Sequence, residues 1–287
     1  MTEDALTRAS SGGTQLAGIV GWPVGHSLSP RIHSFWIRKY RLDAAYVPLP
    51  VQPGHLATAL RALPALGFRG CNVTVPHKVE ARALVDEEST LASVVGAVNT
   101  IVIQDGRLLG RNTDVDGFLE GLREQAPGWS RSDRRAVVVG AGGAARAVVA
   151  GLRAELDGEI VIANRTLAKA KDIIQQFDNT RAIGLRALEA ELDGAGLLVN
   201  TSTLGMMDGP TLDPDLAGLA ADAVVADIVY APLETALLRT ASRRGLATVD
   251  GLGMLLHQAV PGFEGWFGVR PRVDQELRNH VLATLGR

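Results

Sequence analysis

Gly140 and Gly142 follow an apolar run at residues 136–139, and Ala145 lies near the start of the next stretch, 144–152, which has helical character. This strand–turn–helix context and this spacing are typical of a loop that binds the pyrophosphate of a dinucleotide. Gly140 would permit the tight turn, Gly142 would let the backbone approach the pyrophosphate, and Ala145 would let the helix pack closely on the strand. The N–H groups at the helix start would bind the phosphates.

The end of the next expected strand indicates which dinucleotide would bind. An acidic residue about 20 residues after such a loop usually binds the ribose 2′-hydroxyl of NAD. Here the strand ends in Asn164, Arg165 and Thr166, and Lys169 follows one turn later. Cations in place of a carboxylate favour a 2′-phosphate, so the pattern predicts NADP(H). A glycine turn without a ligand and a solvated arginine are the alternatives at this point.

The composition describes an ordinary globular protein. A length of 287 residues suits about two domains, and the net charge of −2 gives no basic surface for nucleic acid or anionic membrane. The start of the chain has no pattern of a secretory signal, and the single Cys71 excludes an intramolecular disulfide. The six histidines are scattered, without metal-binding spacing. We therefore expect a cytoplasmic protein with no metal site and no membrane span.

Predicted strands and helices alternate along the chain. Residues 1–15 are small and polar, and we expect them to be frayed. Residues 46–51 are typical of a strand, and their prolines place it at a sheet edge. Asp105 and Gly106 separate two apolar runs, which predicts a hairpin. This alternation predicts an α/β fold with parallel or mixed sheets covered by helices.

Four polar clusters before the glycine loop could contact a substrate. In the first, Ser29 and Pro30 suit the N-cap and first position of the following helix, whereas Ser27 has no such explanation. In the second, Asn72 and Thr74 share one face of a strand. Lys78 lies just past the end of that strand. Capping and solvation remain the alternatives to ligand binding.

The third and fourth clusters lie at expected element starts. Asn99 begins a strand, where its amide could cap a turn, and Asp114 could be the N-cap of a helix over residues 115–123. Each structural explanation is adequate when its cluster is considered alone.

Taken together, these clusters resemble the shikimate dehydrogenase family over nearly the whole chain, from about Gly18. The matching segments are residues 18–30, 72–78, 96–100, 112–114, 140–143, 164–166 and 250–254, with Gln258. The resemblance implies an enzyme that reduces 3-dehydroshikimate to shikimate with NADPH, with a catalytic pair formed by Lys78 and Asp114. His77 and Lys169 depart from residues that are frequent in the family, and Lys169 replaces an arginine.

The resemblance also implies the binding residues. Substrate contacts would come from Ser27, Ser29, Asn72, Thr74, Asn99, Tyr230 and Gln258. Cofactor contacts would come from Gly140, Ala141, Gly142, Gly143, Ala144, Ala145, Asn164, Arg165, Thr166, Lys169, Thr201, Gly251 and Met254. The segment 201–205 and the start of the helix at 251–254 would lie near the nicotinamide.

The expected chemistry suits these residue types. A ketone that receives hydride develops negative charge on its oxygen, which a lysine ammonium can stabilise and protonate. A carboxylate nearby would orient the ammonium. A substrate with several hydroxyls and a carboxylate would account for the many Ser, Thr, Asn and Gln side chains.

We expect a discontinuous substrate domain, residues 1–113 plus 251–287, and a Rossmann NADP-binding domain, residues 114–250. Gln258 would return to the first domain to reach the same pocket as Ser27. A monomer or homodimer is expected, with a small-molecule substrate as the partner. The alternatives are a quinate/shikimate dehydrogenase of broader specificity, against which Arg165 argues, and a non-catalytic paralogue that binds NADPH or shikimate.

Overall fold

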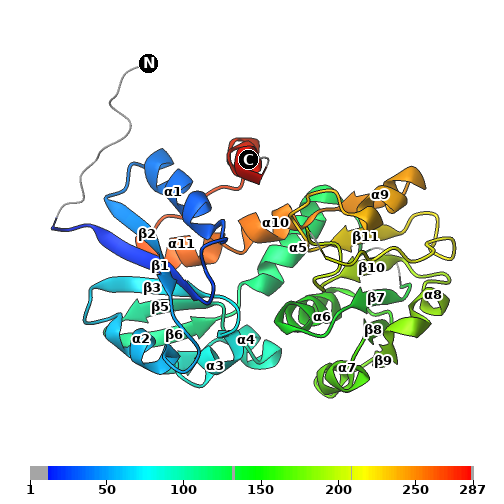
Figure 1. The fold of residues 1–287 in the computed structure, drawn as a ribbon, viewed down its shortest axis with the longest axis horizontal. Helices are drawn as coiled ribbons and strands as arrows, with labels where there is room; N and C mark the ends of the chain where they lie inside the picture. The colour runs from blue at the N-terminus through cyan, green and yellow to red at the C-terminus, as the bar shows by residue number, and fades with distance from the viewer. Residues whose placement is uncertain (1–11, 131–132, 208, 286–287) are drawn as a thin grey trace. The chain divides into compact units, whose positions relative to one another are not determined.

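The computed structural model describes residues 12–130, 133–207 and 209–285 (Figure 1). Of the segment expected to be frayed, residues 1–15, residues 1–11 lie outside this part, whereas Gln15 is the first residue of β1. The chain divides into two compact units: unit 1 extends to Ala92 and also contains Ala97–Arg111 and Ala259–Thr284, and unit 2 contains Ser93–Gly96 and Asn112–Gln258. Each unit has its own six-stranded sheet, so the predicted α/β class is confirmed.

The sheet of unit 1 is mixed, in the order β2-β1-β3-β5-β6-β4. Its strands are β1 (Gln15–Gly21), β2 (Ala44–Pro50), β3 (Phe68–Val73), β4 (Glu87–Glu88), β5 (Thr100–Gln104) and β6 (Arg107–Arg111). β1 pairs in parallel with β2 and β3, whereas β5 is antiparallel to β3 and β6. β2 is an edge strand, as its prolines predict. The two-residue turn between β5 and β6 has positive φ at Asp105 (49°) and Gly106 (75°), as its Asp-Gly sequence predicts.

An aromatic cluster holds the C-terminal helices of unit 1 against its sheet. The helices of this unit are α1 (Ser29–Lys39), α2 (Leu56–Ala62), α3 (Lys78–Arg82), α11 (Val260–Phe267) and α12 (Gln275–Leu285), and the division between the units falls within α4 (Thr90–Val95). The ring of His33 stacks on Tyr46 at 4.1 Å and lies 5.4 Å from Trp266. Trp266 Nε1 donates to the carbonyl of Ile101 on β5 at 2.8 Å. Segments more than 150 residues apart in sequence therefore share one core.

Unit 2 has a fully parallel sheet in the order β12-β11-β10-β7-β8-β9. Its strands are β7 (Ala136–Val139), β8 (Ile160–Asn164), β9 (Thr180–Gly184), β10 (Leu197–Asn200), β11 (Val224–Asp227) and β12 (Ala247–Val249). Its helices are α5 (Asp114–Gln125), α6 (Gly143–Glu155), α7 (Leu167–Ile174), α8 (Leu188–Glu191), α9 (Ala236–Arg243) and α10 (Gly251–His257), with a 3-10 turn at Leu185–Ala187. This is the strand order of a doubly wound dinucleotide-binding fold, whose direction reverses between β7 and β10.

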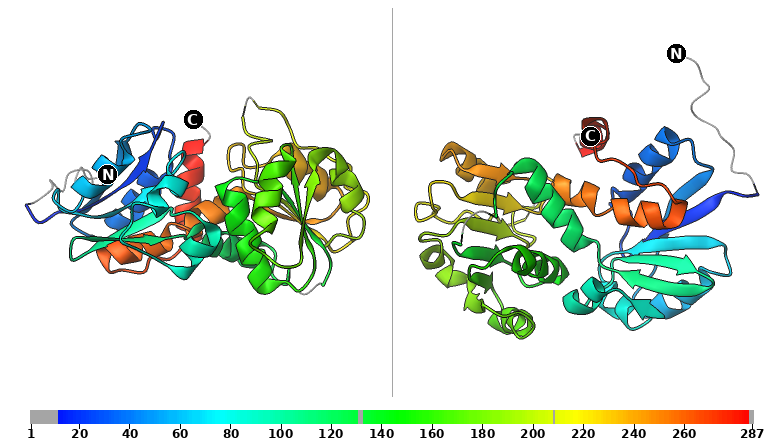
Figure 2. Two further views of the ribbon diagram at one scale, coloured as in Figure 1. Left: turned by 90° about the horizontal axis from the view of Figure 1, so that it is seen from below. Right: turned by 180° about the vertical axis from the view of Figure 1, so that it is seen from behind.

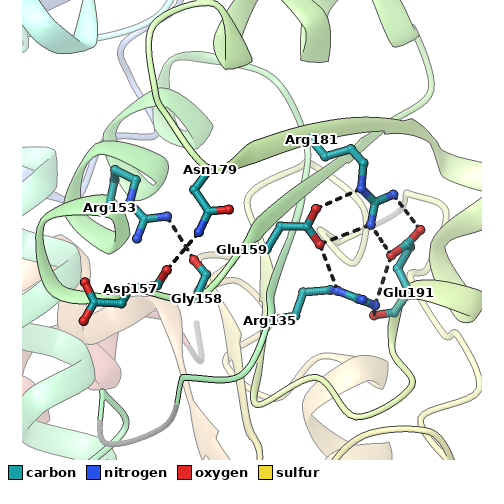
Figure 3. Close-up of polar contacts among 8 residues, drawn as sticks. All are labelled: Arg135, Arg153, Asp157, Gly158, Glu159, Asn179, Arg181 and Glu191. Atoms are coloured by element: carbon teal, nitrogen blue, oxygen red, sulfur yellow. Dashed lines mark hydrogen bonds and ion pairs between the residues drawn. The ribbon is translucent and has the colours of Figure 1, made fainter.

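Four charged residues link elements near the amino ends of the strands in unit 2 (Figure 3). Arg181 on β9 contacts Glu159, just before β8, at 3.0 Å and Glu191 on α8 at 2.7 Å. Arg135, just before β7, contacts the same two carboxylates at 3.2 and 3.1 Å. The arginines hold the pKa of both glutamates below the ordinary value. This network lies at the opposite end of the sheet from the glycine turn, so its role is to join strands.

Helices α5 and α10 lie side by side (Figure 2), and glycines line their contact. A Cβ atom on Gly117 would lie 2.6 Å from Gln258 Cβ, and one on Gly253 would lie 2.6 Å from Gln125 Nε2. The amide of Gln125 also accepts a hydrogen bond from the N–H of Asp250 at 3.2 Å. The start of α5 therefore lies beside the end of α10, and the two helices are antiparallel.

This packing places residues 251–258 in unit 2, although we expected Gln258 to belong with unit 1. The cause is the glycine contact, because no larger side chain would let α10 come this close to α5. The functional division into residues 1–113 plus 251–287 and 114–250 stays a prediction.

We expect Gly117→Ala to lower the free energy of unfolding by about 2 kcal/mol, because the added methyl group overlaps Gln258 and the carbonyl of Met254. Urea denaturation of the two proteins measures the difference. Gly143→Ala is the matched control, since its added methyl meets no atom within 4 Å. An equal loss in both variants would contradict the close-packing argument.

Candidate active site

The glycine turn lies at the reversal point of the parallel sheet. Gly140 follows β7 with φ +115°, and a Cβ atom there would lie 2.6 Å from Thr201 Oγ1. Thr201 follows β10, and its N–H and hydroxyl both donate to the carbonyl of Val139 at 2.7 Å. Two features therefore require glycine at position 140: its positive φ, and the close approach of Thr201, which leaves no room for a side chain. The two predicted cofactor residues, Gly140 and Thr201, lie together where α/β sheets bind nucleotides.

The turn opens directly into α6. Gly142 is the N-cap in an extended conformation, and α6 begins at Gly143. Neither glycine would place a Cβ within 4 Å of another atom, so the space beside this backbone is open. Ala145 is fully buried against the sheet, whereas Ala141 and Ala144 are half-buried. This geometry is typical of a loop in which the backbone N–H groups at the start of a helix bind a pyrophosphate.

The basic strand end lies after β8, next to β7 in the sheet. Asn164 Nδ2 donates to the carbonyl of Thr166 at 2.8 Å, and this bond shapes the turn into α7. Arg165, Thr166 and Lys169 are exposed. These four residues are the ones predicted at the basic strand end, and its two cations, Arg165 and Lys169, face solvent.

The first polar cluster of unit 1 lies at the start of α1. The predicted N-cap role of Ser29 is wrong, because Leu28 is the N-cap and Ser29 is the first helical residue. The hydroxyl of Ser27 accepts a hydrogen bond from the N–H of Ser29 at 3.2 Å. Ser27 therefore supplies the local hydrogen bond that we expected from Ser29. Ser29 itself is buried.

Asn72 lies near the carboxyl end of β3, and its amide has three protein partners. Its Oδ1 accepts from the Tyr46 hydroxyl at 2.6 Å. Its Nδ2 donates to the carbonyl of Asn99 at 3.3 Å and to Thr100 Oγ1 at 3.0 Å. Two predicted substrate residues, Asn72 and Asn99, are thus brought together. Tyr46 was not among the predicted site residues, and its only signal in the sequence is a polar tip in an otherwise apolar strand.

Lys78 is the first residue of α3 and is half-buried. The preceding loop crosses the ends of β1 and β2, because Trp22 N donates to the carbonyl of Val75 at 3.1 Å and His77 Nε2 lies 2.7 Å from the carbonyl of Val51. A carbonyl can only accept, so Nε2 of His77 carries the hydrogen. Buried His77 therefore anchors the segment that carries Thr74 and Lys78. The carbonyl of Lys78 accepts from Val98 N at 2.9 Å, next to Asn99.

Asp114 and Gln258 lie in unit 2, at the packed ends of α5 and α10. Asp114 is buried at the first position of α5, and its N–H donates to Asn112 Oδ1 at 3.1 Å. Thr113, which is the N-cap in place of the expected Asp114, donates from its hydroxyl to the carbonyl of Gln258 at 2.8 Å. These hydrogen bonds hold the two predicted residues at one corner of the unit.

Tyr230 follows β11, whose last residue is the buried carboxylate Asp227. Burial raises the pKa of the half-buried Tyr230 phenol above its ordinary value. Burial also raises the pKa of Asp227 to about 6. The hydrogen bonds to Asp227 come from neutral donors: Asn200 Nδ2 at 2.9 Å, Val229 N at 3.0 Å and Thr235 Oγ1 at 2.8 Å. Asp227 was absent from the predicted site.

We expect the stability of the protein to decrease as Asp227 ionises. Between its ordinary pKa of 3.8 and the folded value of about 6, the folded state binds more proton than the unfolded state. The free energy of unfolding should therefore fall by roughly 3 kcal/mol as pH rises from about 4 to about 6.5. Urea denaturation at each pH should be used to measure the free energy of unfolding of the wild type and of Asp227→Asn, and the difference between the two values tests the prediction. A difference that grows in favour of the wild type with rising pH would contradict this assignment.

Gly251 begins α10, and a Cβ atom there would lie 2.2 Å from the carbonyl of Ile228. The carboxylate of Asp250 caps the helix by accepting from Leu252 N at 3.0 Å. Met254 lies one turn further and is half-buried. The predicted nicotinamide-side residues Gly251 and Met254 thus lie on a helix that starts against the end of β11.

Residues 12–130, 133–207 and 209–285 contain no helix with the length and apolar character needed to cross a membrane. Over the same residues, no three His, Cys, Asp or Glu side chains gather in a way that could hold a metal ion.

Two family models match the chain. Residues 19–101 match the shikimate dehydrogenase substrate binding domain, and residues 123–205 match the shikimate/quinate 5-dehydrogenase family. Among curated relatives, the shikimate dehydrogenase (NADP(+)) of Paramagnetospirillum magneticum is 54% identical over 275 residues, which cover 95% of this chain and 100% of the relative.

Solved structures agree with these matches. A shikimate 5-dehydrogenase from Thermus thermophilus in complex with NADP(H) and shikimate is 33% identical, with a TM-score of 0.81, covering 95% of this chain and 100% of that one. A quinate dehydrogenase from Corynebacterium glutamicum in complex with NAD is 32% identical, with a TM-score of 0.87. The match covers 94% of this chain and 99% of the quinate dehydrogenase. From its sequence and its fold, the chain belongs to the shikimate dehydrogenase family.

Proposed function

We propose that this chain is an NADP-dependent shikimate dehydrogenase, which catalyses the reversible reduction of 3-dehydroshikimate to shikimate on the route to the aromatic amino acids. The observation that carries the proposal is the set of predicted polar residues on segments that follow neighbouring strands of one sheet. Asn72, Thr74 and Lys78 lie at or just after the carboxyl end of β3, Asn99 directly precedes β5, and Ser27 and Ser29 lie on the segment from β1 into α1. Family membership then indicates the substrate class.

The amide of Asn72 limits what it can offer a substrate. Both Nδ2 hydrogens have protein partners, whereas Oδ1 accepts one hydrogen bond and retains a second lone pair. Asn72 would therefore accept from a substrate hydroxyl. Ser27 and Ser29, whose hydroxyls can both donate and accept, suit the carboxylate of the substrate.

The residues present fit the cofactor. Gly140 lets the turn pack against Thr201, Gly142 and Gly143 leave the space beside the backbone open, and Arg165 and Lys169 supply exposed cations after the neighbouring strand β8. When bound, NADPH supplies a hydride. Arg165 would pair with the 2′-phosphate, because its planar guanidinium can make two parallel hydrogen bonds to phosphate oxygens.

Lys78 and Asp114 would perform the proton chemistry. As hydride adds to the carbonyl carbon, the oxygen gains negative charge, which the Lys78 ammonium stabilises before it donates a proton to that oxygen. Asp114 would orient the ammonium and bind a substrate hydroxyl. Tyr230 and Gln258 would complete the substrate contacts.

An assay of NADPH oxidation with 3-dehydroshikimate, run beside NAD reduction with quinate, tests the proposal. We expect turnover in the first reaction and at least about 100-fold lower kcat/KM in the second. Comparable rates would favour a quinate/shikimate dehydrogenase, an alternative supported by the likeness to the quinate dehydrogenase. NADPH binding without turnover in either assay would favour a non-catalytic binding protein. The oligomeric state, monomer or homodimer, and the cytoplasmic location stay predictions.

A further inference from the structure

The loop after β10 is organised by one side chain, Asn200. Its Oδ1 accepts from the N–H and the hydroxyl of Ser202 at 3.0 and 2.7 Å. Its Nδ2 donates to the carbonyl of Leu204 at 2.9 Å and to Asp227 Oδ1 at 2.9 Å. Asn200 is fully buried, and both ends of its amide are used. The path of residues 201–204 therefore depends on which way this amide faces.

Asp227 fixes that orientation. The two ends of an amide have nearly the same shape, so shape alone does not decide between the two orientations of Asn200. A carboxylate only accepts, and Asp227 also accepts from Val229 N and Thr235 Oγ1. It therefore requires the NH2 group of Asn200 to point toward β11 and the oxygen to point toward Ser202.

This arrangement has a stability cost. The Asp227 carboxylate is 2% exposed, and its hydrogen bonds come from neutral groups. The pKa raised by burial shows that the fold disfavours the charged form. A buried charge that lowers stability is expected where function requires it.

The loop that these residues hold reaches two predicted ligand regions. Thr201 lies against the glycine turn at Gly140, and Gly205, with φ +93°, would place a Cβ 3.9 Å from Asp227 Oδ2. Residues 228–230 lead from Asp227 to Tyr230, and the carbonyl of Ile228 contacts Gly251. We propose that Asn200 and Asp227 are positioning residues, which fix loop 201–205 in the shape that receives the nicotinamide end of NADPH. This inference rests on the proposed function of the chain.

The test compares NADPH affinity, from fluorescence titration, with thermal stability. Asn200→Asp keeps the size of the side chain but loses the donor to Leu204 and Asp227, so the Kd for NADPH should rise at least about tenfold. In Asp227→Asn the amide oxygen can still accept from Asn200 Nδ2 and Val229 N, while the new NH2 group faces Thr235 Oγ1 and the Thr235 hydroxyl loses its acceptor. A neutral amide then replaces the carboxylate that holds Asn200, so the orientation of Asn200 is fixed less strongly. This variant should be at least as stable as the wild type at pH 7, and its Kd should rise about threefold. The KM for shikimate at saturating NADP+ should change less than about twofold in both variants.

Asn179→Asp is the matched control. Asn179 lies in the same unit and donates from Nδ2 to the carbonyl of Asp157 at 2.8 Å (Figure 3), away from the loop. The Kd of Asn179→Asp for NADPH should remain within about twofold of the wild-type value. The proposal is overturned if Asp227→Asn binds NADPH as tightly as the wild type, or if the control loses as much affinity as Asn200→Asp. If the wild type itself binds no NADPH, the proposed function fails instead.

Discussion

Lys78→Ala should lower kcat for the reduction of 3-dehydroshikimate by about 1,000-fold, with a change in KM of less than about threefold. The ammonium is expected to act mainly in the transition state, where the carbonyl oxygen becomes negative. Loss of such an interaction lowers kcat and kcat/KM together. Steady-state kinetics at saturating NADPH measure both constants.

Two variants separate proton donation from charge. Lys78→Arg keeps a cation at this position, but a guanidinium is a poor proton donor because it stays protonated, so it should recover little of the lost kcat. Lys171→Ala, at an exposed lysine of α7, should leave kcat unchanged. If Lys78→Ala raised KM alone, Lys78 would be a binding residue and the proton would come from another group.

Local sequence patterns predicted much of the fold, because periodicity and turn chemistry depend on near neighbours. The prolines of β2 placed it at a sheet edge, and Asp105 with Gly106 predicted the β5–β6 hairpin. The position of α10 could not be read from apolar periodicity, since its contact with α5 is made by glycines on separate segments.

The candidate site was predicted best where its residues are close in sequence. Gly140, Gly142 and the strand end at Arg165 belong to one β–α–β unit, so their proximity follows from spacing alone. Asn200 and Asp227 were missed although each ends a buried strand. In parallel sheets, ligands bind beyond the carboxyl ends of the strands. This rule could have singled out Asn200 and Asp227, because both are polar and both lie at such an end.

A structural role at a residue does not compete with its proposed ligand-binding role. Ser27 hydrogen-bonds the start of α1, and Asn72 joins β2, β3 and β5. These bonds use only part of the capacity of each side chain and fix its orientation. A side chain held in this way loses less conformational entropy when it binds a ligand, so a structural role supports the proposed binding role.

Arg165→Asp should reverse the charge that meets the 2′-phosphate and change the ratio of kcat/KM for NADP to that for NAD by at least about 100-fold. Two effects add: the charge-assisted bond of the guanidinium is lost, and a carboxylate both repels the phosphate and can accept from the ribose 2′-hydroxyl of NAD. Because Arg165 is exposed, the change should not affect folding. Initial rates of shikimate oxidation with each cofactor measure the ratio.

The matched control is Arg186→Asp, the same charge reversal at an exposed arginine between β9 and α8. It changes the net charge of the protein by the same amount, so any general electrostatic effect on a polyanionic cofactor appears in both variants. The excess in Arg165→Asp over Arg186→Asp measures the local contact. Lys169 should sustain part of the NADP preference, since it lies one turn from Arg165. Equal ratios in the two variants would show that the 2′-phosphate binds elsewhere and would remove the argument for NADP that rests on this strand end.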